Sequence, residues 1–167
     1  MGIEIKRNRT LIYLFALLIT FVSCDSNRVY DQYVAVEGNS WSQENPIEFE
    51  FQIKDTLLRN NLYINIRNNQ DYAYSNLFLI THLNFPDGKK IVDTLEYEMA
   101  DKTGRFLGSG LSGIKESKLF YKERSIFPSS GDYKLAIYQA MRKNGDPEGL
   151  KSLEGVTDVG FRIEKIE

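Results

Sequence analysis

The chain has 167 residues, of which 42% are hydrophobic and 13% aromatic, so its length and composition suit one domain with a buried core. Its formal net charge of −2, with both signs mixed along the chain, argues against nucleic-acid binding. One cysteine and one histidine exclude a disulfide framework and a histidine- and cysteine-rich metal site, and we predict no cofactor.

The first 24 residues have the pattern of a lipoprotein signal peptide. Three basic residues within positions 6–9 precede the apolar run 11–22, and the small residue Ser23 precedes Cys24. The run has 12 residues, against the roughly 20 that a membrane-spanning helix needs. An ordinary secreted leader cut near Ser23 is the alternative, but it leaves Cys24 as a lone thiol in an oxidising compartment. We therefore predict cleavage after Ser23 and lipidation of Cys24.

Lipidation of Cys24 would anchor the mature chain to a membrane outside the cytoplasm. Each buried methylene of an acyl chain contributes about 0.8 kcal/mol, and two or more chains give stable anchoring. We expect a signal peptide over 1–23, a short tether over 24–28 and a single domain over 29–167. The mature chain keeps 18 basic and 22 acidic residues, a net charge of −4. Because the tether is short, the domain is expected close to the bilayer.

Short strands dominate the mature sequence. Apolar and polar residues alternate clearly in 47–53, whereas 77–83 is apolar on both faces and predicts a central strand. Strands are expected at 29–37, 47–53, 62–67, 77–83, 95–99, 118–127, 133–141 and 156–166. About eight strands without a long amphipathic helix predict an all-β fold, an antiparallel β-sandwich. A small β-barrel is the alternative that periodicity leaves open.

A glycine-rich stretch over 101–113 contains a formal G-x-G-x-x-G match at 108–113. That motif binds dinucleotides where it follows a strand and opens a helix. Here residues 115–121 are predicted to form a strand, so we reject a nucleotide site. The stretch is expected to be a long surface loop.

His82, the only histidine, lies on the predicted central strand with Phe78 and Ile80 on its face. A lone histidine in this setting is expected to be a packed or hydrogen-bonded core residue. Nothing in the spacing indicates a Ser-His-Asp or Cys-His arrangement. We predict no catalytic residues and no metal site.

Tyr72 and Tyr74 stand among amide side chains in the loop 68–76. Exposed tyrosine offers a large contact area at small entropic cost, and amides adapt their hydrogen bonds. The alternative is a hairpin loop whose tyrosines cover a sheet edge. For Trp41 and Phe106 two roles also remain: an exposed contact residue, or a residue at the edge of the core. The predicted partner-binding surface consists of Tyr72, Tyr74 and Phe106.

A series of short motifs, running from Cys24-Asp25 to the C-terminus, is similar to one known family. The motifs are Arg67-Asn68-Asn69, residues 71–79, 86–89, 93–97, 99–101, Gly104, Leu107-Gly108, 116–119, Tyr121-Lys122 and 139–142. In this order they resemble the gliding motility-associated lipoprotein family GldH of Bacteroidota. Phe106 departs from the tryptophan of many members, and Phe21 from the leucine usual in lipoprotein signals.

The resemblance implies a lipid-anchored cell-envelope protein, in the outer membrane and facing the periplasm or the exterior. It implies support of gliding motility or of the associated protein secretion, through contact with other envelope lipoproteins, and no enzymatic activity. In species that do not glide, it implies an envelope or secretion role. This interpretation predicts an apolar or aromatic surface patch outside the core.

The sequence is also compatible with two other functions. A glycan-binding sandwich would need Trp41, Tyr72, Tyr74 or Phe106 to line a groove. An envelope enzyme would need a pocket with converging titratable groups of perturbed pKa.

Overall fold

The computed structural model describes residues 26–143, 145 and 148–166. The predicted signal peptide and Cys24 lie outside the described residues. No helix in the described part is long and apolar enough to cross a membrane. The elements are β1 Arg28–Ala35, the short 3-10 helix η1 Glu37–Asn39, β2 Ser40–Ser42, β3 Ile47–Ile53, β4 Arg59–Asn68, β5 Asn76–Asn84, β6 Lys90–Glu98, β7 Lys115–Ile126, β8 Gly131–Gln139, β9 Ser152–Glu154 and β10 Val156–Lys165.

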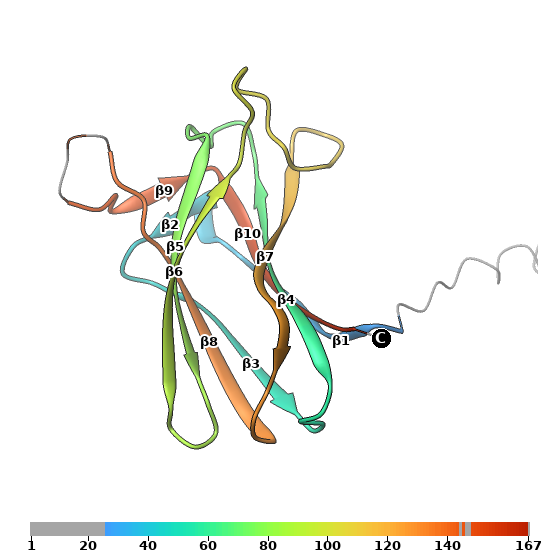
Figure 1. The fold of residues 1–167 in the computed structure, drawn as a ribbon. Helices are drawn as coiled ribbons and strands as arrows, with labels where there is room; N and C mark the ends of the chain where they lie inside the picture. The colour runs from blue at the N-terminus through green and yellow to red at the C-terminus, as the bar shows by residue number, and fades with distance from the viewer. Residues whose placement is uncertain (1–25, 144, 146–147, 167) are drawn as a thin grey trace, which may run out of the picture.

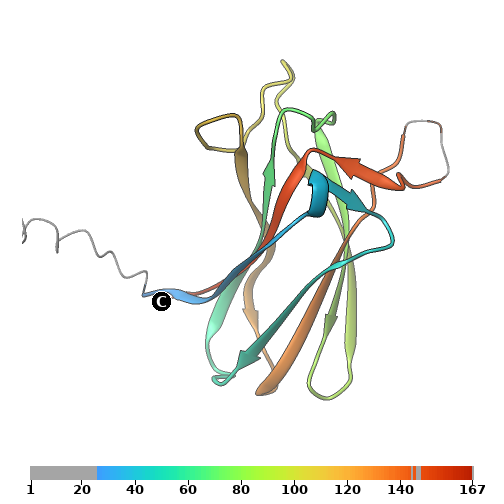
Figure 2. The same ribbon diagram turned by 180° about the vertical axis from the view of Figure 1, so that it is seen from behind.

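The strands form two facing antiparallel layers (Figure 1). The β4 sheet has the order β1-β10-β4-β7, and the β5 sheet has the order β3-β8-β5-β6. A two-stranded sheet, β2-β9, lies near one end of the sandwich, as the view from behind also shows (Figure 2). None of these sheets closes into a barrel, so the predicted β-sandwich is confirmed and the barrel alternative is wrong.

The core lies between the two sheets and is rich in aromatic rings. Phe49, Phe51 and Ile53 on β3 are buried, and the residues between them are exposed, as a strand with one covered face requires. The ring of Phe51 lies 5.3 Å from that of Phe161 on β10 and 5.6 Å from that of Tyr133 on β8. Full burial of each such side chain contributes about 1.5–3 kcal/mol.

The predicted strands are all present, with two additions. The predicted range 47–53 matches β3, and β6 and β7 begin several residues earlier than expected. The structure adds β2 and β9, which pair through Trp41 and Leu153. Three residues are too few to produce a visible alternation, so sequence periodicity had no signal for them.

The central strand β5 is covered on one face only. It is an inner strand of its sheet, as predicted, and it lies between β8 and β6. Leu77, Leu79 and Leu83 are buried in the core. Its alternate residues lie on the outer face and are only partly buried. The expectation that His82 is a core residue is therefore wrong, because no further layer in the described part of the chain covers it.

Hydrogen bonds join the edge strands β6 and β7 across the two sheets. The Tyr121 hydroxyl donates to Asp93 Oδ2 at 3.0 Å and accepts from the fully buried Thr81 Oγ1 at 3.2 Å. The Tyr97 hydroxyl donates to the Phe120 carbonyl at 2.6 Å. Burial raises the pKa of Tyr121, and burial with the Asp93 charge raises the pKa of Tyr97 to about 12. These hydroxyls are therefore protonated donors at neutral pH.

Tyr121→Phe is expected to lower the free energy of unfolding by about 1–3 kcal/mol, because it leaves the buried Thr81 hydroxyl without its partner. Urea-induced unfolding of the purified protein measures this. The matched control is Tyr30→Phe, since the Tyr30 hydroxyl donates to Gln32 at an exposed site. Equal losses for the two variants would contradict the structural role of the Tyr121 hydrogen bonds.

Candidate functional site

The outer face of the β5 sheet carries a group of apolar and aromatic side chains. Phe78, Ile80 and His82 alternate with the buried leucines of β5 and therefore lie on the outer side of the sheet, where Phe78 also packs against the edge of the core. Val92 on β6 pairs with His82, and Tyr138 on β8 pairs with Ile80. Val92 is 55% exposed and the other four are partly exposed. We call these five residues the outer apolar face.

Two adjoining hollows indent this face. One of about 410 Å³ has Phe78 and Met141 in its lining, and one of about 240 Å³ is lined in part by His82 and Tyr138. Both include Ile80, Ala140 and Arg142 in their linings, so the two hollows are neighbours. The segment after β8 is held against the sheet here, because the Ala140 amide donates to the Phe78 carbonyl at 2.9 Å.

The centre of the outer apolar face is uncharged at neutral pH. The rings of His82 and Tyr138 lie 4.8 Å apart. Burial lowers the pKa of His82, and the positive charge of Lys90 lowers it further. The imidazole is therefore neutral at pH 7. The exposed Arg142 places a cation at the rim of both hollows.

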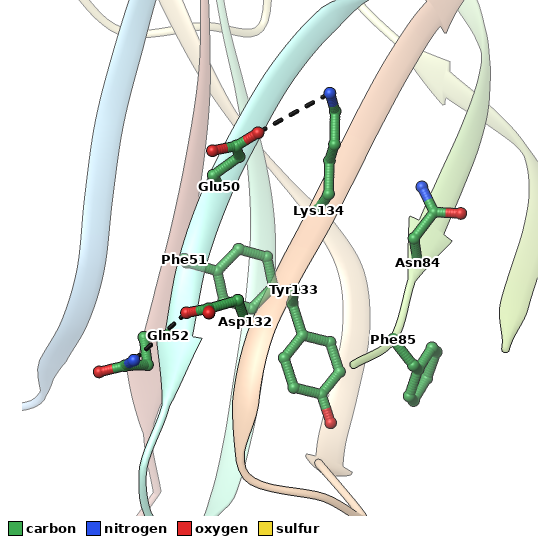
Figure 3. Close-up of a pocket in the computed structure, with 8 residues that line it drawn as sticks. All are labelled: Glu50, Phe51, Gln52, Asn84, Phe85, Asp132, Tyr133 and Lys134. Atoms are coloured by element: carbon green, nitrogen blue, oxygen red, sulfur yellow. Dashed lines mark hydrogen bonds and ion pairs between the residues drawn. The ribbon is translucent and has the colours of Figure 1, made fainter. Parts of the chain in front are cut away.

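A third pocket, of about 540 Å³, lies elsewhere on the β5 sheet (Figure 3). Its polar groups pair with one another: Lys134 lies 3.8 Å from Glu50, and the Gln52 amide donates to Asp132 at 3.2 Å. The Tyr133 hydroxyl points away from these pairs in Figure 3 and donates to a backbone carbonyl at 2.7 Å. The enzyme hypothesis requires side chains that converge on one point in a catalytic pocket, and the side chains of this pocket do not converge.

The described part of the chain offers no cluster of metal ligands. No group of three or more His, Cys, Asp or Glu side chains that could hold a metal ion occurs among residues 26–143, 145 and 148–166.

Tyr72, Tyr74 and Phe106, the predicted partner-binding residues, lie together in the structure. The Tyr72 ring is 6.0 Å from that of Tyr74 and 6.2 Å from that of Phe106. Tyr72 is only 3% exposed, its hydroxyl donates to the Asn76 carbonyl at 2.7 Å, and burial raises its pKa. The prediction of an exposed contact residue is therefore wrong for Tyr72. Tyr74 and Phe106 are partly exposed and pack against the core, so their role in binding stays a prediction.

Trp41 is also interior. It is 1% exposed, and its Nε1 donates to the Asn45 carbonyl at 3.2 Å. With Trp41 and Tyr72 both buried, the aromatics proposed to line a glycan groove do not form a platform on which a sugar could stack. The glycan-binding hypothesis therefore loses two of the four aromatic residues on which it rested.

The glycine-rich stretch is a loop that leads into β7, as predicted, so a strand stands where a dinucleotide site needs a helix. Its Ser109 backbone exchanges hydrogen bonds with that of Glu116 on β7, at 2.7 and 2.9 Å. A Cβ on Gly108 would lie 2.8 Å from the Glu116 carbonyl oxygen. This glycine allows close packing of backbone against backbone.

Comparison with known proteins shows the family. The model of the GldH lipoprotein family matches residues 28–163. The chain belongs to the GldH lipoprotein family. It is 53% identical over 154 residues to the gliding motility lipoprotein GldH homolog of Christiangramia forsetii, covering 92% of this chain and 93% of the relative. It is 44% identical over 159 residues to the gliding motility lipoprotein GldH of Flavobacterium johnsoniae, covering 95% and 97%.

Solved structures offer a weaker likeness. The VP2 subviral particle of infectious bursal disease virus aligns with 87% of this chain at 18% identity and a TM-score of 0.40. The chain spans 34% of that VP2 chain. A TM-score this low carries no argument about the GldH fold or its function.

The outer apolar face lies wholly within the region that matches the GldH family, whereas Cys24 precedes it. The face was not among the sites predicted from the sequence. The sequence does contain a sign of this face, because residues 77–83 are apolar on both sides of the strand. The same pattern also fits a strand that is buried on both sides, which is the prediction made above. The contributions of Val92 and Tyr138 depend on strand pairing, which periodicity does not specify.

Proposed function

We propose that this GldH family member is a lipid-anchored, non-enzymatic component of the cell envelope. In this proposal it supports gliding motility, or the protein secretion associated with it, by binding envelope protein partners through the outer apolar face. Two relatives of 44% and 53% identity carry the name gliding motility lipoprotein, and the Ser23-Cys24 sequence fits lipidation. Residues 1–23 would be removed, and residues 24–28 would form the tether.

The observation that carries the proposal is the outer apolar face itself. The solvent side of a two-layer sandwich is normally polar, because each strand alternates core and solvent positions. On β5 the solvent positions Phe78 and Ile80 are instead apolar, and hollows lie beside them. A contiguous apolar surface on a folded domain marks an interaction site.

The opposite outer face makes the contrast clear. On the β4 sheet, Arg67 Nε lies 2.6 Å from Glu116 Oε2, and Arg162 lies 2.7 Å from Asp31 Oδ2. The Arg67 guanidinium also lies 4.1 Å from the centre of the Tyr33 ring. Charged and aromatic side chains there bind one another, as in an ordinary solvated surface. Similar ion pairs join β3 and β8 of the β5 sheet, where Lys134 lies 2.8 Å from Glu48. The contrast therefore concerns the five residues of the outer apolar face and not the whole outer side of that sheet.

The chemistry of the outer apolar face specifies the partner. Its neutral centre and two hollows fit a protein surface that inserts apolar or aromatic side chains. Arg142 at the rim favours a carboxylate on the partner. Large side chains buried in central pockets supply most of the binding energy of such interfaces.

The test compares polar and charged substitutions on the two outer faces. Val92→Glu with Ile80→Gln is expected to weaken partner binding by at least about tenfold, because a carboxylate would be buried without a partner. The control is Phe120→Glu on β7, since Phe120 is 56% exposed and Val92 is 55% exposed. The readouts are gliding and secretion by cells that express only the variant, with photo-cross-linking from position 92 or 120.

The variant must first be shown to reach the envelope at the wild-type level. If the outer-face variant then supports full gliding and secretion, or if Phe120→Glu is equally impaired, partner binding through this face is contradicted.

A further inference from the structure

The four strands of the β4 sheet end in one row beside the point where the tether enters. The Lys165 amide donates to the Asn27 carbonyl at 2.9 Å, and the Ile166 amide donates to the Arg59 carbonyl at 2.8 Å. Arg59 in turn pairs with Ile126 at the end of β7. Figure 1 shows the start of β1 beside the C-terminal end of β10. We call this row, with the preceding turn residues Leu57 and Leu58, the tether rim.

The length of the tether limits how far the rim can stand from the anchor. Cys24 precedes Asn27 by three residues, and an extended chain covers at most about 3.6 Å per residue, or roughly 11 Å in all. Strands lie about 4.8 Å apart, so Ile126 is roughly 14 Å from Asn27 across the sheet. Any lipid on Cys24 therefore keeps Asn27 within roughly 11 Å of the anchor and the far end of the rim, Ile126, within roughly 25 Å of it.

The rim exposes large apolar side chains where polar residues are usual. Leu57 is 87% exposed, Ile126 is 52% exposed and Leu58 is 37% exposed. The turn that presents Leu57 is ordered, because the Leu57 amide donates to Asp55 Oδ1 at 2.9 Å. Turns that connect strands usually carry glycine, asparagine, aspartate or proline. Exposed leucines on an ordered turn are typical of a contact with an apolar phase.

Basic side chains surround these apolar residues. The five on or next to the rim are Arg28, Lys54, Arg59, Arg124 and Lys165. The same segments also carry the acidic residues Asp55, Glu123 and Glu164, of which Glu164 pairs in register with Arg28. None of the five basic side chains has an ion pair within residues 26–143, 145 and 148–166. This concentration occurs in a mature chain whose net charge is −4. Lysine and arginine beside exposed leucines complement anionic lipid headgroups.

We propose that the tether rim rests on the lipid surface that carries the anchor, with Leu57 and Ile126 inserted at headgroup depth and the basic side chains against lipid phosphates. This inference rests on the proposed lipid anchor and adds an orientation to it. Figures 1 and 2 both place β5 and β6 on the far side of the sandwich from the start of β1. An attached rim would leave the outer apolar face free to meet partners.

The experiment uses the full lipidated chain in vesicles that contain a lipid with a spin-labelled headgroup. The sulfur of Cys24 is blocked by lipid, so one new cysteine can carry a fluorophore. Leu57→Cys and Ile126→Cys test the rim. Leu111→Cys and Val92→Cys are matched controls, since Leu111 is 90% exposed and Val92 is 55% exposed. The spin label quenches only fluorophores held near the headgroups.

Fluorophores at positions 57 and 126 are expected to be quenched at least about threefold more than those at 111 and 92. The difference should grow when phosphatidylglycerol replaces phosphatidylcholine and shrink in high salt. The double variant Arg59→Gln with Arg124→Gln should reduce the difference in quenching, and Arg59→Lys with Arg124→Lys should keep it. Equal quenching at all four positions, or stronger quenching at 92, would overturn the orientation while leaving the anchor intact. Absence of lipid on Cys24 by mass spectrometry would overturn both.

Discussion

Replacing Cys24 with alanine is expected to move the protein almost completely from the membrane fraction to the soluble fraction and to abolish its contribution to gliding or secretion. The reason is that two or three acyl chains supply nearly all of the membrane affinity, whereas the exposed apolar residues of a rim give only weak, reversible contact. Fractionation of envelopes, followed by cross-linked pull-down of the wild-type and Cys24→Ala proteins, measures both effects.

The Cys24→Ala domain should remain folded, because the buried residues of the core run from Val36 to Ile163. Circular dichroism of the soluble variant checks this. Ser26→Ala serves as the control, since it alters the predicted tether without removing the sulfur of Cys24. Full function from the unanchored protein would exclude a role that depends on anchoring.

Gly155→Ala is expected to lower the free energy of unfolding by about 3 kcal/mol or more. Gly155 links β9 to β10 with φ of 86°, a left-handed conformation that alanine adopts poorly. A Cβ there would also lie 2.1 Å from the Tyr72 amide nitrogen. The clash is with backbone, so no side-chain rotation can relieve it. The Asn69 amide, which donates to the Gly155 carbonyl at 2.9 Å, would be displaced as well.

The matched control is Gly104→Ala. Gly104 has φ of 81°, but no described atom lies within 4 Å of the place that a Cβ would take, so only the backbone strain of about 1 kcal/mol applies. Urea unfolding of both variants separates the two contributions. If the two losses are equal, the close approach of Gly155 to Tyr72 is not important for stability.

The strand predictions are correct where they depend on a pattern within one segment of the sequence. In β3 the side chains alternate between core and solvent, and the alternation in the sequence marks the same bounds, 47–53. Residues 77–83 show the limit of this approach. Leu77 and Leu79 are buried as predicted, but Phe78 and Ile80 are not, because their exposure depends on whether another layer covers the outer side of the sheet.

The aromatic residues of the loops show a second limit. Tyr72 and Phe106 are far apart in the sequence, and composition alone suits either an exposed or a buried role. The burial of Tyr72 depends on Gly155, a residue 83 positions later, whose lack of a side chain lets the two backbones approach. No pattern within a single segment contains that information.

The sequence by itself determined the all-β class, most strand positions and the membership of the GldH family, and it predicts the lipid anchor at Cys24. These properties depend on local periodicity or on short motifs. Only the tertiary structure decided that Tyr72 and Trp41 are interior, that His82 lies outside the core and that β5 exposes an apolar face. Burial is a property of the layers that strands from distant segments form, so it becomes visible only when those segments pair.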